Sequence, residues 1–115
     1  MNNRYLYRAK RTDNGEWVIW NIFTGIPHDI IISEDTICQC TGVKDKNEKL
    51  IWENDIVTGW FDDKRITGYI KYGSNAIFFI ERKGLYGIHL DNSQDWLEVI
   101  GNIFDNPEML EVDSE

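Results

Sequence analysis

The chain has 115 residues, the usual size of a single domain, and this length leaves little room for two independent cores. Its formal net charge is −8, and such an acidic total argues against general binding to DNA or RNA, whose phosphates attract cations. No apolar run approaches the roughly 18 residues of a membrane span, and the N-terminus lacks the apolar region of a signal peptide. We therefore expect a soluble cytoplasmic domain without a membrane partner.

The first third of the chain has the pattern of a β-hairpin followed by short strands. Five Trp, five Tyr and five Phe are many for this length, and aromatic side chains favour the pleated surface of a sheet. Residues 4–10 alternate as a half-buried strand does, and residues 12–15 supply the turn chemistry of a tight hairpin. Residues 17–23 are almost all apolar, which predicts a partner strand covered on both faces. Two short β pieces are then expected at 30–32 and 36–41.

The rest of the chain predicts a β-meander with one helical turn at its end. Residues 42–49 are charged and without periodicity, so we expect a loop there. Short strands then recur at roughly ten-residue spacing, which is typical of a small sandwich or barrel. Apolar character resumes at 50–52, and the expected strands are 56–61, 65–72, 76–82, 85–90 and 96–100. A short helix is predicted over 105–111, with Asn106 as its N-cap and Pro107 in its first position.

Cys38 and Cys40 are the two cysteines of the chain. In an extended strand they project from one face about 6.6 Å apart, near the outer limit for a disulfide. We interpret them as reduced core residues. The alternative, a metal site, needs further ligands, and only His28 and His89 are available, in no zinc-finger spacing. We expect neither a metal nor another cofactor.

Charge is segregated along the chain. Residues 84–115 contain eight acids and no Lys or Arg, whereas residues 1–11 contain no acid. This polarity allows a basic arm of one subunit to meet an acidic face of another; a merely solvated acidic surface is the alternative. The basic residues of the N-terminal segment are Arg4, Arg8, Lys10 and Arg11.

Three stretches of sequence carry a resemblance to a known family. The first is Arg8-Ala9, although Lys10 stands where that family often has Trp. The second runs from Gln39 to Val57, begins Q-C-T-G-V-K-D-K-N and ends I-W-E-N-D-I-V. The third runs from Leu97 to Leu110 and reads L-E-V-I-G-N-I-F-D-N-P-E-M-L. Together they resemble the YopX family of small bacteriophage and prophage proteins. The matching positions that we interpret as structural are Thr41, Gly42, Asp45, Asp55, Gly101, Asn102, Asn106 and Pro107.

The resemblance implies a fold and a setting, and it carries no catalytic residue. It implies a mainly β protein with an N-terminal β part over 1–41 and an SH3-like barrel over 50–104, in one domain spanning 1–115. It also implies a phage or prophage gene acting in the cytoplasm of a bacterial host, with no assigned activity.

The residues themselves suggest binding and not catalysis. No phosphate-binding loop or nucleophilic triad occurs, and the carboxylates Asp45, Glu53 and Asp55 fit turn closure better than metal or acid–base chemistry. We expect a non-enzymatic accessory protein acting by protein–protein contacts or self-assembly; the alternative is a nucleic-acid-associated module of phage replication or regulation. Basic residues interleaved with aromatic ones can hold single-stranded nucleic acid, although the total charge opposes this. The candidate surface consists of Trp60, Arg65, Tyr69, Lys71, Arg82 and Lys83.

Overall fold

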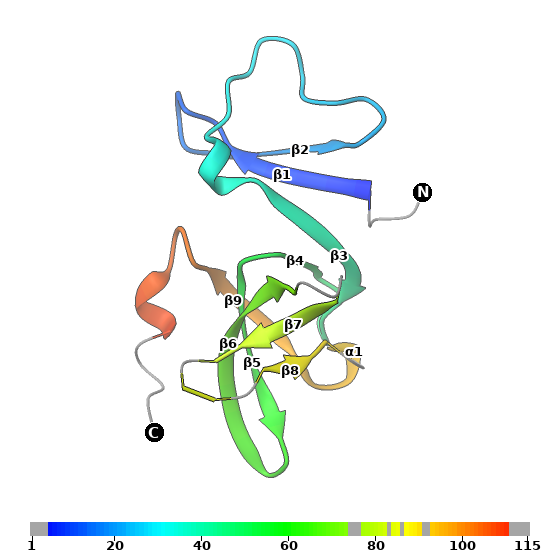
Figure 1. Ribbon diagram of the computed structural model, residues 1–115, viewed down its shortest axis with the longest axis vertical. Coiled ribbons are helices and arrows are strands. Elements are labelled where there is room, and N and C mark those ends of the chain that lie inside the picture. Colours follow the sequence, from blue (N-terminus) through cyan, green and yellow to red (C-terminus); the bar gives the residue numbers. More distant parts are fainter. Residues whose placement is uncertain (1–4, 74–76, 83, 86, 91–92, 111–115) are drawn as a thin grey trace.

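A computed structural model describes residues 5–73, 77–82, 84–85, 87–90 and 93–110 (Figure 1). Within these ranges the chain forms a four-stranded sheet in the order β2-β1-β3-β4 and a five-stranded sheet in the order β8-β7-β6-β5-β9. All strand pairings are antiparallel. The molecule is elongated, 47 × 30 × 28 Å, and the long strand β3 connects the N-terminal hairpin to the rest (Figure 1). The mainly β class is therefore confirmed.

The elements have the following bounds. The first sheet contains β1 (Leu6–Lys10), β2 (Trp17–Asn21), β3 (Cys38–Lys44) and β4 (Leu50–Trp52). The second sheet contains β5 (Asp55–Phe61), β6 (Lys64–Tyr72), β7 (Phe78–Glu81), β8 (Ile88–His89) and β9 (Glu98–Asn102). The short helical turns are η2 (Glu34–Thr36), α1 (Ser93–Trp96) and η3 (Pro107–Leu110). None of the helices in the described residues is long and apolar enough to cross a membrane.

The predicted N-terminal hairpin is present, but its second strand differs from the expectation. β1 pairs with β2 along its whole length, and Gly15 takes a positive φ of 73° in the connecting turn. β2 ends at Asn21 because the side-chain oxygen of Asn21 accepts the N–H groups of Phe23 and Thr24 and turns the chain. The strand lies at the edge of its sheet, and Ile19 is 55% exposed, so the prediction of burial on both faces was wrong.

The segment between β2 and β4 also departs from its predicted pattern. The expected strand at 30–32 is a single bridge between Ile32 and Arg11, and Thr36 lies in η2. β3 starts later than expected and continues to Lys44, into residues predicted as a loop. Gly42, at a φ of 86°, lies where the register between β3 and β4 shifts, and this irregularity lets the strand continue past the bend.

The second sheet follows the predicted meander from β5 to β8. The two-residue turn between β5 and β6 has positive φ at both Asp62 and Asp63, the geometry that suits a tight hairpin. β7 and β8 are shorter than predicted, and residues 76, 83 and 86 lie outside the described part. Residues 93–96, expected as loop and strand, form the helical turn α1, so β9 begins at Glu98. The SH3-like barrel that the resemblance implied stays a prediction.

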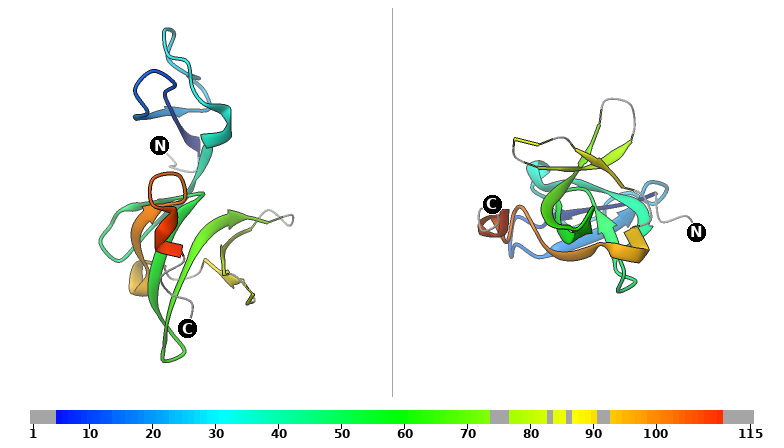
Figure 2. Two further views of the ribbon diagram at one scale, coloured as in Figure 1. Left: turned by 90° about the vertical axis from the view of Figure 1, so that its left-hand side faces the viewer. Right: turned by 90° about the horizontal axis from the view of Figure 1, so that it is seen from below.

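The main hydrophobic cluster is formed by the second sheet, its neighbour β4 and Leu97. Its six members are at most 6% exposed: Ile51, Val57, Ile66, Ile70, Ile80 and Leu97. Cys38 and Cys40 are buried and free, as predicted. The C-terminal turn η3 is a 3₁₀ turn that lies beside β6 (Figure 2). Asn106 precedes η3 and its carbonyl accepts the N–H of Met109, as predicted for the N-cap position, but its side-chain oxygen accepts the N–H of Asn102 in β9.

Candidate interaction site

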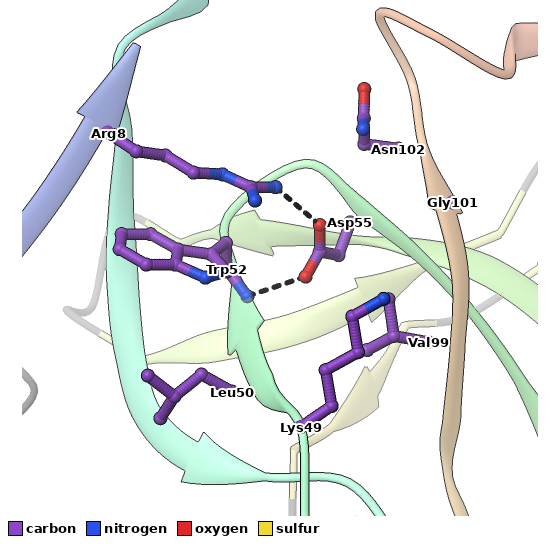
Figure 3. Close-up of a pocket in the computed structure, with 8 residues that line it drawn as sticks. All are labelled: Arg8, Lys49, Leu50, Trp52, Asp55, Val99, Gly101 and Asn102. Atoms are coloured by element: carbon purple, nitrogen blue, oxygen red, sulfur yellow. Dashed lines mark hydrogen bonds and ion pairs between the residues drawn. The ribbon is translucent and has the colours of Figure 1, made fainter. Parts of the chain in front are cut away.

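The two sheets meet at a buried ion pair between Arg8 of β1 and Asp55 of β5 (Figure 3). Arg8 Nη2 lies 2.8 Å from Asp55 Oδ1, and the two side chains are 14% and 4% exposed. The other carboxylate oxygen, Oδ2, accepts the backbone N–H of Trp52 at 2.8 Å. Breaking such a pair leaves an uncompensated buried charge, so these contacts fix the N-terminal hairpin to the second sheet.

Two tryptophan rings contact the guanidinium group of Arg8. Its central carbon lies 4.2 Å from the ring centroid of Trp17 and 4.9 Å from that of Trp52, both within range of a cation–π interaction. Arg8 Nε is buried and has no hydrogen-bond partner in the described structure. The Arg8 side chain is thus fixed by one carboxylate and two rings, with one buried donor, Nε–H, left without a partner.

A second polar link joins the same two regions. Lys10 Nζ bonds Asp105, and the indole N–H of Trp17 donates to Asp105 Oδ2 at 3.3 Å. The ring of Trp17 also packs edge-on against Phe104, with centroids 6.0 Å apart. The hydrogen bond from Lys10 lowers the pKa of Asp105.

Burial changes the acidity of the junction carboxylate. Removal of Asp55 from water raises its pKa from the ordinary 3.8 to about 6, although the charge of Arg8 and the N–H of Trp52 act in the opposite direction. Burial also raises the pKa values of Cys38 and Cys40, so neither thiol is activated as a nucleophile.

A pocket with a volume of about 240 Å³ opens beside the ion pair. Figure 3 shows the Lys49 side chain rising along Val99 toward the carboxylate of Asp55. The pocket is lined by Arg8, Lys49, Leu50, Trp52, Asp55, Val99, Gly101 and Asn102. No group of three or more His, Cys, Asp or Glu side chains in the described residues is placed to hold a metal ion.

The predicted signature residues of the β3–β4 segment hold backbone in place. Thr41 Oγ1 donates to the carbonyl of Ile51 at 2.7 Å. The carboxylate of Asp45 is 1% exposed and accepts three backbone N–H groups, those of Asn47, Lys49 and Val99, each at 2.9 Å. Asp45 thus fastens the turn that carries Lys49 to β9.

The signature residues near the C-terminus close the turn after β9. Asn102 Oδ1 accepts the N–H groups of Phe104 and Asp105. A Cβ at Gly101 would lie 2.6 Å from Asn106 Oδ1, so glycine there makes room for the Asn106 side chain. Pro107 begins the turn η3. These contacts place Asp105 where Lys10 and Trp17 reach it.

The structure brings four of the six predicted surface residues together. Trp60 pairs across the strands with Arg65, and Tyr69 and Lys71 follow at alternate positions of β6, so all four share one face of the β5–β6 hairpin. Trp60 is 64% exposed. Arg82 lies on the opposite face, because its stem is 3.1 Å from the position of a Cβ on Gly68. Lys83 lies outside the described residues.

Three of the four basic residues that suggested an intersubunit contact are paired within the chain. Arg8 pairs with Asp55, Lys10 with Asp105, and Arg11 with Asp13. Arg4 lies outside the described residues. Arg8 and Lys10 are therefore engaged in the molecule's own junction, whereas Arg11 is held by a local ion pair.

The N-terminal segment exposes apolar side chains, among them side chains of residues 17–23, which were expected to be covered. Within residues 5–37, Ala9 is the single apolar side chain that is buried. Seven large apolar side chains there are 39–74% exposed: Tyr5, Ile19, Ile22, Phe23, Ile26, Ile31 and Ile37. The ring of Phe23 lies 5.3 Å from that of Tyr5, and the N–H of Ile22 donates to the carbonyl of Tyr5. We call Tyr5, Ile22 and Phe23 the apolar hairpin end.

The fold and the junction define a small β protein in which an N-terminal hairpin is joined to a separate core by buried polar contacts. Comparison with protein families gives a match over residues 2–111 to the family described as YopX protein. The chain belongs to the YopX family, as the three sequence stretches predicted. No curated protein matches the chain.

Proposed function

We propose that this YopX family protein is a non-enzymatic accessory protein that binds another protein through the apolar side chains of its N-terminal segment. The observation that carries the proposal is the exposure of seven large apolar residues in a segment that buries only Ala9 among its apolar residues. Exposed apolar groups of this kind mark interaction sites, because burying them against a partner removes them from water.

The junction chemistry supports a binding role over a catalytic one. Both oxygens of Asp55 are engaged, and the Arg8 guanidinium is held against Asp55 and two rings. A general base or an electrostatic catalyst needs a group free to meet a substrate. The proposal includes a phage or prophage origin and action in the bacterial cytoplasm, both implied by the sequence resemblance.

Affinity capture with matched variants tests the proposed function. The tagged protein is exposed to lysate of the infected host, with and without nuclease, and recovered proteins are quantified. Ile22→Ser/Phe23→Ser alters the apolar hairpin end, where the two side chains are 54% and 71% exposed. Trp60→Ser/Leu85→Ser is the matched control, with side chains 64% and 63% exposed elsewhere.

We expect the first double variant to lose a stoichiometric partner that the control variant retains, with or without nuclease. Urea unfolding of each variant checks that the fold is kept. Equal recovery by both variants would contradict the proposal. Sedimentation of the purified protein, which separates monomer from oligomer, shows whether the partner is a second copy.

A second candidate function, binding of single-stranded nucleic acid, is favoured by the shared face of Trp60, Arg65, Tyr69 and Lys71. Aromatic rings stack on bases, and cations contact phosphates. Fluorescence anisotropy with a single-stranded oligonucleotide should then show binding that weakens with salt and falls in Trp60→Ser. Absence of binding at low salt would exclude this candidate.

A further inference from the structure

Within the described residues, the pocket at the junction has unpaired hydrogen-bond donors on Arg8 and Lys49, while its one carboxylate, Asp55, accepts a hydrogen bond at each oxygen, so the lining carries more positive than negative charge. Asp55 accepts from Arg8 and Trp52 with its two oxygens. The side-chain oxygen of Asn102 accepts two backbone N–H groups, and its amide nitrogen donates to Asp105.

The unused donors are cationic. Arg8 Nε–H is buried with no partner, and Lys49 forms no ion pair among the described residues. The positive charge of Lys49 acts on Asp55, where it partly offsets the larger effect of burial, which raises the pKa of that carboxyl. A ligand that forms hydrogen bonds with these donors must carry acceptor atoms. A negatively charged acceptor gives the strongest hydrogen bonds.

The size and the apolar wall of the pocket limit the ligand further. A volume of about 240 Å³ corresponds to about eight water molecules in the liquid, which is the scale of one side chain or a small acid. Leu50, Trp52 and Val99 provide apolar surface beside the cations. The site therefore fits a short carbon chain that ends in an anionic oxygen pair.

We propose that the pocket between β1, β4 and β9 binds a carboxylate group, with its charge beside Lys49 and Arg8 and its carbon chain against Leu50, Trp52 and Val99. The nearby carboxylate of Asp45 does not compete for the cations, because three backbone N–H groups satisfy it. The carboxylate can belong to an acidic side chain of a protein or to a free small acid. The inference does not depend on the proposed function, since it concerns a different surface.

The test is an NMR titration of the ¹⁵N-labelled full chain with three probes. Propionate represents a free acid, N-acetyl-glutamate α-amide represents a protein side chain, and propionamide is the uncharged control. We expect saturable shifts of the Leu50, Trp52 and Gly101 amide signals with the two acids and none with propionamide. Tighter binding of the capped glutamate assigns the pocket to a protein side chain, and tighter binding of propionate assigns it to a free acid.

Matched lysine variants separate this site from non-specific charge effects. Lys49→Met keeps most of the side-chain length and should weaken binding at least tenfold. Lys64→Met, an exposed change at the start of β6, should leave binding unchanged. The proposal is overturned if propionamide binds as well as propionate, if Lys49→Met binds like the wild type, or if no acid saturates the signals up to about 50 mM.

Discussion

The N-terminal segment, residues 5–37, and the second sheet use apolar residues in opposite ways. The second sheet and β4 bury an aliphatic core whose six members are at most 6% exposed. The N-terminal segment buries Ala9 and leaves isoleucines and Phe23 in contact with solvent. The second sheet is thus stabilised mainly by its own core, whereas the N-terminal segment depends on its contacts with the rest of the molecule.

The difference shows how the N-terminal hairpin keeps its place without a core. It is attached through the pairing of β1 with β3, through Arg8 and Asp55, and through the contacts of Asp105. Polar contacts of this kind fix geometry without consuming apolar surface, so the exposed side chains stay available to a partner.

The largest expected effect is in the aliphatic core. Ile70→Ala removes a fully buried side chain of β6 and should lower the free energy of unfolding by about 2–5 kcal/mol, through lost burial and a cavity. Ile31→Ala, at a side chain that is 74% exposed, should change it by less than about 0.5 kcal/mol. Urea denaturation measures both. Similar decreases in the free energy of unfolding in the two variants would contradict the proposed difference between the regions.

Removal of the Arg8 cation at the junction should have the second-largest effect. In Arg8→Met the buried carboxylate of Asp55 loses its partner, so the free energy of unfolding near neutral pH should fall by about 3–5 kcal/mol. Fluorescence of Trp17 and Trp52, which contact Arg8, reports the transition. Arg11→Met is the control, because Asp13, its partner, is mostly exposed, and little change is expected. An equal response of the two variants would argue against a special role of the junction.

The pH dependence of stability gives a smaller effect with a definite sign. The pKa of Asp55 is raised from 3.8 to about 6 in the folded protein, so the folded state binds this proton more tightly than the unfolded chain. The resulting stabilisation is complete below the unfolded pKa and is lost as pH rises through 6.

The difference in unfolding free energy between the wild type and Asp55→Asn should therefore fall by about 2 kcal/mol between pH 4 and 7.5. Taking the difference removes the contributions of the other carboxylates. Denaturant titrations across this range measure it, and a flat difference would show that Arg8 keeps Asp55 ionised throughout.

The smallest predicted effect concerns the turn after β9. Gly101→Ala should displace the Asn106 side chain and break its bond to the N–H of Asn102, at a cost of about 1 kcal/mol. In Gly101→Ala/Asn106→Ala the two shortest contacts, to Oδ1 and Cγ of Asn106, are absent and only the contact to Cβ at 3.0 Å is left, so the double variant should cost less than the sum of the single ones. If the decreases in unfolding free energy, measured by thermal or urea unfolding, were additive, the proposed contact between residues 101 and 106 would be contradicted.

Much of the fold was predictable because the relevant signals are local. Asn14-Gly15 indicated the first hairpin, and regular turn signals indicated the meander from β5 to β8. The error at residues 17–23 arose because an apolar run does not reveal whether a second layer covers it. The path of β3 depends on Gly42 and a register shift, which involve pairing with distant residues.

The candidate site was harder to predict from the sequence than the fold. Arg8 and Asp55 stood out as matches to the family pattern, but their contact joins residues 47 positions apart. The position of Trp17 against Arg8 likewise depends on how the sheets dock. One available signal was overlooked: residues 17–27 contain no charged side chain, which is unusual for an edge strand and the loop that follows it.

Native-state hydrogen exchange tests most directly whether the N-terminal hairpin is held by the junction and not by a core. The account predicts that amides of β1 and β2 open at a lower free energy than those of β5 and β6, and that Arg8→Met lowers protection more in β1 and β2. Equal opening free energies in all four strands, lowered equally by Arg8→Met, would show one cooperative unit and contradict the account.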